Sequence, residues 1–260
     1  MQPTTNSLIK KIAVLLGFAG MVAVNTLAML GKINGINTAD VSALYPTLFT
    51  PAGYTFSIWG TIYLLLLIYV VIQLISRDFG AGSKPSKIAL WFVLSCVANA
   101  GWIFAWHYGQ IAGSLLLMIA LMICLSNILV LVKGAGDTFR SVVGLELPFG
   151  LYAGWITVAT VANVSVFLAD LGWDGFGVPA VWLIAVLLIA AAVALLAAQN
   201  TRNLAYPAAV IWGFGGVLAR YAPHLRFDTG SDQLWIALTL VVSMLALAAH
   251  WITLIVRRVR

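Results

Sequence analysis

Eight long apolar runs constrain this chain more than any other feature of its sequence. They cover residues 8–30, 54–75, 88–106, 111–132, 142–168, 179–198, 205–220 and 234–256. Most approach the ~20 apolar residues with which a helix crosses the hydrocarbon core of a bilayer. The seventh run is the shortest and contains Pro207 and Gly213-Phe214-Gly215-Gly216, so we expect it to be kinked or tilted. The sequence therefore predicts an all-α integral membrane protein with about eight transmembrane helices.

The composition excludes the main soluble classes of protein. Only 8% of the residues are charged and 62% are hydrophobic, whereas an average soluble domain has about 25% charged residues. These proportions exclude a soluble enzyme, a disordered chain and a secreted domain held together by disulfides. Cys96 and Cys124 lie inside apolar runs and have no metal-ligand spacing. We therefore expect the lipid bilayer as the main partner, with no nucleic acid, no metal site and no obligatory cofactor.

The net charge of +6 comes from basic residues spread over loops, which fits the positive-inside rule better than nucleic-acid binding. An eight-helix chain with both ends in the cytoplasm has these basic residues inside: Lys10, Lys11, Arg77, Lys84, Lys87, Lys133, Arg140, Arg202, Arg257, Arg258 and Arg260. The outer side then carries only Lys32, Arg220 and Arg226. We therefore expect both termini in the cytoplasm, a first helix that stays uncleaved, and a bacterial inner membrane as the location.

One loop is much longer than the others. Residues 31–53 form a segment of 23 residues on the outer side, with Asn34, Asn37, Pro46 and Pro51. A long ordered loop in a compact membrane protein is often functional. Two interpretations stay open, a lid over a site and a passive connector.

Three apolar runs carry aromatic and amide residues at helical spacing, which lines one face of each helix. The stripes are Trp59 and Tyr63; Trp91, Ser95, Asn99, Trp102 and Trp106; and Tyr152, Trp155, Ala159 and Asn163. Each stripe alone is more typical of helix packing, but three together favour a cavity for a flat, mostly apolar ligand. Glu146 is either a proton-linked site or an ion-pair partner of Arg140 or Arg202, and we favour the ion pair. No acid–base pair is placed together, so we do not expect an enzyme.

Three segments resemble the TspO/translocator-protein family, also called tryptophan-rich sensory proteins. They are Pro51-Ala-Gly-Tyr-Thr-Phe-Ser-Ile-Trp59-Gly-Thr-Ile-Tyr63, Ala98-Asn99-Ala-Gly-Trp102, and Leu151-Tyr152-Ala-Gly-Trp155-Ile-Thr-Val-Ala159-Thr-Val-Ala-Asn163. Order, spacing and helix number all agree with the family, over roughly residues 8–170. The chain departs from it in two places: Leu151 stands where the family has proline, with Pro148 about one turn earlier, and the sterol-associated Tyr and Arg are missing after Asn163.

The resemblance implies a five-helix core at residues 1–170, with the loop 31–53 as its outer lid and a pocket that binds tetrapyrroles such as porphyrin or haem. The binding residues it implies are Trp59, Tyr63, Asn99, Trp102, Tyr152, Trp155, Ala159 and Asn163. Residues 171–260 then add three transmembrane helices, as in a longer, divergent member of the family.

Three functions stay open at this point. The first is a binding protein, sensor or transporter for a tetrapyrrole. The second is a secondary transporter or channel for a small amphipathic solute. The third is an accessory subunit with no ligand, and a homodimer is possible in each case. A closed cavity would favour the first function, a water-filled path past Glu146 the second, and a solid core the third.

Overall fold

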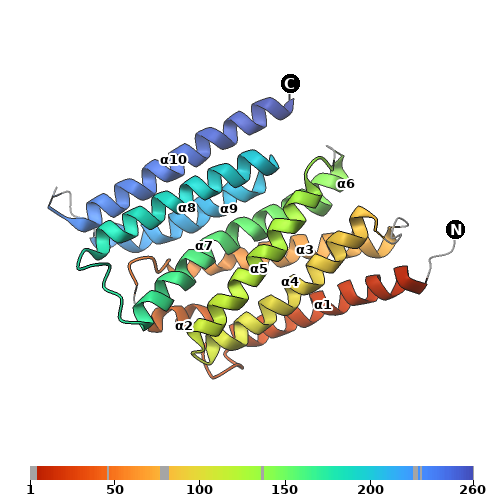
Figure 1. Cartoon of the computed structure of the whole chain (residues 1–260), viewed down its shortest axis with the longest axis horizontal. Coiled ribbons are helices and arrows are strands. Elements are labelled where there is room, and N and C mark those ends of the chain that lie inside the picture. Colours follow the sequence, from red (N-terminus) through yellow and green to blue (C-terminus); the bar gives the residue numbers. More distant parts are fainter. Residues whose placement is uncertain are drawn as a thin grey trace.

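The computed structural model describes residues 5–45, 47–76, 82–135, 138–224, 228 and 230–259, and within these ranges it contains helices and no strand. The helices lie side by side as one elongated bundle (Figure 1). Seven of them in the described part of the chain are long and apolar enough to cross a membrane. They are α1 (Thr5–Met29), α3 (Ile58–Ile75), α4 (Lys84–His107), α5 (Ile111–Val132), α7 (Leu147–Asp170), α8 (Pro179–Thr201) and α10 (Asp232–Val259). The predicted all-α membrane fold is confirmed.

The seventh apolar run forms α9 (Ala205–Tyr221), a helix of 17 residues. At 1.5 Å per residue it is about 26 Å long, near the lower limit for a membrane span. Its two ends nevertheless contact opposite ends of the bundle. Just before the helix, the Asn203 amide donates to the carbonyl oxygen of Glu146 at 2.8 Å. At its other end, the Tyr221 hydroxyl donates to the carbonyl oxygen of Leu48 at 2.6 Å.

Because α9 runs the length of the bundle, eight long helices in the described part of the chain pass along it, and the start of α1 and the end of α10 lie at the same end (Figure 1). Two contacts mark this end. The Lys11 ammonium donates to the carbonyl oxygens of Leu74 and Ser76, and Arg258 near the C-terminus pairs with Glu146. Of the basic residues used to predict sidedness, Arg77, Arg226 and Arg260 lie outside the described residues, as does Pro46 of the long loop.

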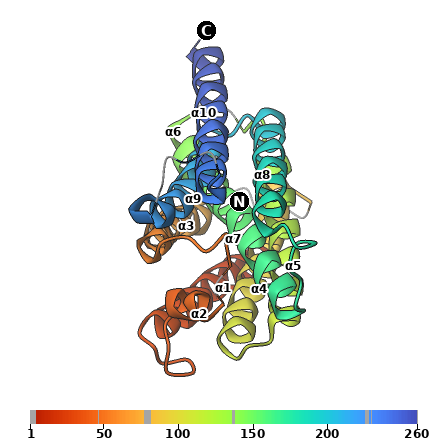
Figure 2. The same cartoon turned by 90° about the vertical axis from the view of Figure 1, so that its left-hand side faces the viewer.

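Helix α7 lies between α8, α9 and α10 on one side and α1, α4 and α5 on the other (Figure 2). It follows a short helix, α6 (Phe139–Ser141), and a π-helical turn, η2 (Val142–Glu146). In this turn the Leu147 N–H donates to the carbonyl oxygen of Val142. The next residue, Pro148, has no N–H to donate, so the regular i→i−4 pattern is interrupted here. The irregularity in the helix therefore lies about one turn before Leu151, beside Pro148.

Glycines allow α7 and α9 to pack closely. A Cβ on Gly154 would lie 2.4 Å from the carbonyl oxygen of Tyr206, and one on Gly213 would lie 2.6 Å from a Val158 methyl group. Small residues let helix backbones approach in a membrane, where van der Waals packing and hydrogen bonds drive association. Helix α9 is therefore packed directly against α7 of the predicted five-helix core, and α10 packs on α8 and α9.

The long loop 31–53 is structured around α2 (Thr38–Leu44) and leads into a 3₁₀ turn, η1 (Gly53–Ser57). The Asn37 side chain caps α2 by accepting from the N–H of Asp40 at 2.9 Å. At the loop's start, the Asn34 amide donates to the carbonyl oxygen of His107 at 2.7 Å. The bond to His107 fixes the start of the loop on the end of α4.

Helix α9 holds the second half of the loop. The Ala52 N–H donates to the carbonyl oxygen of Gly216 at 2.9 Å, and the Trp212 indole donates to that of Thr55, also at 2.9 Å. Tyr221 adds its bond to Leu48. A helix outside residues 1–170 thus anchors the loop predicted as a lid.

Candidate ligand-binding site

The three aromatic stripes converge on Trp59. Its ring is stacked on Tyr63 with a centroid distance of 5.4 Å, and it contacts Trp102 at 6.5 Å. Tyr152 and Trp155 meet it edge-on at 5.8 and 6.3 Å. These distances fall in the range of favourable aromatic pairs. The structure therefore brings together five of the eight residues that the sequence predicted for the site.

A central cavity lies among these rings, beneath the loop 31–53. It has a volume of about 30 Å³, which is room for one or two water molecules at about 15 Å³ each. It is lined by Ser42, Pro51, Phe56, Trp59, Trp102, Trp106, Trp155, Val158, Ala159, Ala162 and Asn163. The aromatic side chains thus face a common space, but they fill most of it by packing on one another.

A larger hollow of about 300 Å³ adjoins the central cavity. It is lined by Asn25, Met29, Asn37, Thr38, Ala39, Gly53, Tyr54, Phe56, Ser57, Trp59 and Tyr63. Phe56 and Trp59 line both spaces and therefore form the wall between them. Movement of these two rings would join the hollow to the central cavity. Tyr63, which does not line the central cavity, faces this hollow instead.

Three polar groups of the site are buried without a hydrogen-bond partner. They are the indole Nε1 atoms of Trp102 and Trp155 and the hydroxyl of Tyr63. Burying a donor without a partner is unfavourable, and such groups in folded proteins are uncommon. The site therefore offers three donors to a molecule that carries acceptor atoms.

Asn99 and Tyr152 have a different place from the one the stripes predicted. Both are fully buried. The Asn25 amide donates to Asn99 Oδ1 at 2.7 Å, and Asn99 Nδ2 donates to the Tyr152 hydroxyl at 2.9 Å. These two hydrogen bonds join α1, α4 and α7. Neither Asn99 nor Tyr152 lines the central cavity. Sequence reasoning missed Asn25, although it is an amide inside the first apolar run.

Asn163 combines both roles. It lines the central cavity, and its Oδ1 accepts a hydrogen bond from the Ser114 hydroxyl at 3.0 Å. Asn163 is therefore a polar residue of the cavity that is also held by a neighbouring helix. Ala159, one turn away on α7, lines the same cavity and leaves space in front of the rings.

Glu146 forms an ion pair, as favoured from the sequence, but its partner differs from both expected ones. Arg258 Nη1 lies 2.7 Å from Glu146 Oε2, and neither Arg140 nor Arg202 takes this place. The reason is that α10 ends beside the π-helical turn that carries Glu146. Among the residues that the structure describes, no group of three or more His, Cys, Asp or Glu side chains could hold a metal ion.

Comparison with known proteins identifies the family of the chain. No curated protein and no solved structure matches the chain. The family model described as TSPO-like protein matches residues 11–255. This match extends beyond residues 8–170, where the resemblance was found, and includes the last three helices. The chain is therefore a member of the TSPO-like protein family.

Proposed function

We propose that this protein binds a flat, hydrophobic ligand of the tetrapyrrole class inside the membrane and serves as a sensor or transporter for it. The observation that carries the proposal is the central cavity beneath the loop 31–53. Trp59, Trp102 and Trp155 face it together, and two of their indole N–H groups have no partner. Aromatic faces with a few polar groups are typical of sites for such ligands.

The roles of the residues follow from their positions. The rings of Trp59, Trp102 and Trp155 would stack on the macrocycle, while the free indole donors would meet carboxylate or carbonyl oxygens at its edge. Tyr63 and Asn163 would add polar contacts at the rim. Asn99 and Tyr152 would act indirectly, because their hydrogen bonds hold α4 and α7 in register.

Binding would require the site to open. Pockets for small molecules usually have volumes of about 300–1,000 Å³, and the central cavity has about 30 Å³. The adjoining hollow has about 300 Å³, so rotation of Phe56 and Trp59 would create one larger space. We propose that the loop 31–53 moves with these rings and closes over the bound ligand.

The proposed membrane arrangement has both termini in the cytoplasm of a bacterial cell. It is supported by the basic residues near the end of the bundle where both termini lie. Residues 1–170 would carry the ligand site, since all residues lining the central cavity fall there. Residues 171–260 would support it from outside. The proposed activity is binding without chemical conversion of the ligand.

One observation favours another function. The rings fill most of the central cavity, and a packed core is what we expect of an accessory subunit with no ligand of its own. A secondary transporter has less support, because the ion pair with Arg258 occupies Glu146. Ligand binding and its dependence on the cavity rings therefore decide between the first and third functions.

The test is titration of the purified protein with protoporphyrin, followed by quenching of tryptophan fluorescence. Trp155→Ala removes a stacking face worth roughly 0.5–1.5 kcal/mol beyond burial, so binding should weaken by about tenfold. Trp251→Ala is the matched control, since Trp251 lies on α10 and lines none of these spaces. Equal affinity of wild type and a folded Trp155→Ala variant would refute the site and favour the accessory subunit.

A further inference from the structure

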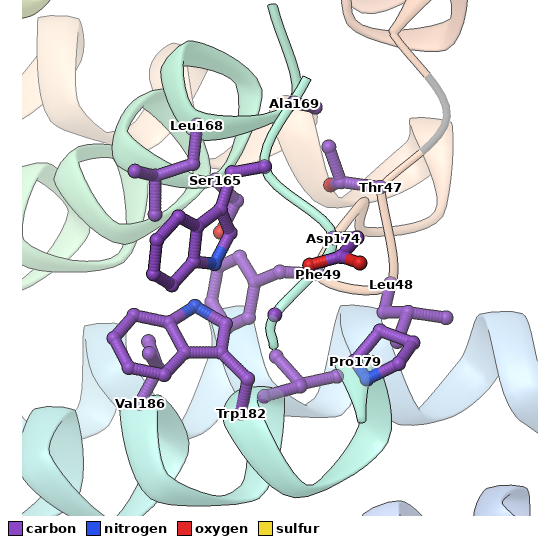
Figure 3. A pocket seen from close by; sticks show the side chains of 13 residues that line it. Thr47, Leu48, Phe49, Ser165, Leu168, Ala169, Asp174, Pro179, Trp182 and Val186 are labelled. Carbon is purple, nitrogen blue, oxygen red and sulfur yellow. The ribbon is translucent and has the colours of Figure 1, made fainter. Parts of the chain in front are cut away.

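A separate cavity of about 270 Å³ lies where α7 ends and α8 begins (Figure 3). Its walls come from residues 47–49 of the long loop, the last turns of α7, the connection to α8 and the first turns of α8. It shares no lining residue with the central cavity or with the adjoining hollow. The proposed tetrapyrrole site therefore leaves this outer cavity unexplained.

Aromatic rings and one carboxylate define the chemistry of the outer cavity. Trp173 and Trp182 line it with their ring centroids 5.7 Å apart and their planes at 60°. Phe49 lines the wall opposite α8, and the carboxylate of Asp174 lies at the same cavity (Figure 3). Most of the other lining residues are apolar. Asp174 forms no ion pair with another residue that the structure describes.

The backbone helps to place Trp173 and Leu48 at the outer cavity. Gly175 has a φ of +71°, and a Cβ there would lie 2.9 Å from Pro179 Cα. Only glycine therefore lets the connection fold back onto α8, which places Trp173 beside Trp182. On the other wall, the hydrogen bond from Tyr221 fixes Leu48.

We infer that the outer cavity binds the ammonium group of an organic cation. A cation over the face of tryptophan is attracted by the ring quadrupole, and quaternary ammonium groups are the usual ligands of such aromatic sites. The Asp174 carboxylate lies at the same cavity and favours a cationic group over an anion that carries no ammonium. The apolar walls suit the carbon part of the ligand. Such a group can come from a free cation or from the headgroup of a zwitterionic lipid.

The probe for this inference is choline, compared with 3,3-dimethylbutan-1-ol, which has the same shape but carbon in place of the charged nitrogen. Titration calorimetry of the full chain in maltoside micelles should detect choline binding and little binding of the alcohol. Trp182→Ala should weaken choline binding about two- to thirty-fold, the range expected for a cation on an indole face. Trp182→Phe keeps a ring and should retain part of the affinity.

Asp174→Asn should also weaken choline binding, whereas Asp170→Asn is the matched control. Asp170 is the last residue of α7 and does not line the cavity. Equal binding of choline and the alcohol, or equal effects of the two Asp→Asn changes in folded protein, would overturn the inference. So would the absence of choline binding at millimolar concentration.

The two sources of the ammonium group are distinguished in nanodiscs. If a lipid headgroup occupies the cavity, choline binds in phosphatidylglycerol discs but is displaced in phosphatidylcholine discs. If a free cation is the ligand, choline binds equally in both. The inference does not depend on the tetrapyrrole proposal, because the outer cavity and the central cavity have no residue in common.

Discussion

Gly154 lies where the backbones of α7 and α9 approach closely, and its replacement by alanine tests this packing directly. The added Cβ would lie 2.4 Å from the carbonyl oxygen of Tyr206 and 2.9 Å from the Cβ of Ala209. Both neighbours belong to α9, and a backbone oxygen can move only with its helix. Overpacking of this kind costs about 1–3 kcal/mol. We therefore expect Gly154→Ala to lower the free energy of unfolding.

The matched control is Gly60→Ala in the first turn of α3, where a Cβ would meet nothing within 4 Å. Both changes gain up to about 1 kcal/mol of helix propensity, so the difference between the two variants isolates the overpacking. Gly154→Ala should therefore be about 1–3 kcal/mol less stable than Gly60→Ala.

Thermal unfolding can be followed with a thiol-reactive dye, because Cys96 and Cys124 are free and buried. At roughly 2–4 °C per kcal/mol for a protein approaching this size, the Gly154→Ala variant should melt several degrees below the Gly60→Ala variant. Equal melting temperatures would refute the close approach of α7 and α9, and with it the way in which the last three helices join the bundle.

Three further predictions concern the rest of the bundle. Asn99→Leu removes two interhelical hydrogen bonds, and at about 0.6–1.7 kcal/mol each it should lower the melting temperature; an unchanged value would contradict the buried chain. Glu146→Gln weakens the pair with Arg258 and should lower the salt dependence of thermal stability, which a salt titration measures. Reporter fusions after Lys32, after Lys84 and at the C-terminus should read outside, inside and inside, and an outer C-terminus would mean that α9 does not cross.

The positions of the helices could be predicted from the sequence because apolar runs in a membrane protein report helix length directly. The run 111–132 coincides with α5 (Ile111–Val132), and the run 205–220 differs from α9 by one residue. The convergence of the stripes followed from helical spacing, since residues three and four apart share a face. Spacing therefore indicated that Trp59, Trp102 and Trp155 would face one another.

The openness of the site could not be predicted in this way. Spacing tells which face of a helix points inward, but not how far apart two helices lie. That distance depends on residues such as Gly154 and Gly213, whose missing side chains allow contact with another helix. The stripes therefore indicated a cavity, while the structure has rings that fill most of it.

Contacts between side chains of distant segments could not be predicted from the sequence either. Glu146 and Arg258 are 112 residues apart, and their contact depends on where α10 ends relative to the π-helical turn. Arg140 and Arg202 were closer in sequence and equally reasonable partners. Asn25 was a single amide in an apolar run, and only the neighbouring position of α4 makes it a partner of Asn99.

The hydrogen bonds of α9 tie this helix to loop residues at both cavities. Gly216 and Trp212 hold the segment from Ala52 to Thr55, directly after the Pro51 that lines the central cavity. Tyr221 holds Leu48, which lines the outer cavity. The loop 31–53, which we propose moves to open the central cavity, is therefore held by α9, a helix outside residues 1–170. A change in the position of α9 would move the loop residues of both cavities together, so this helix has a direct physical route to the proposed binding site.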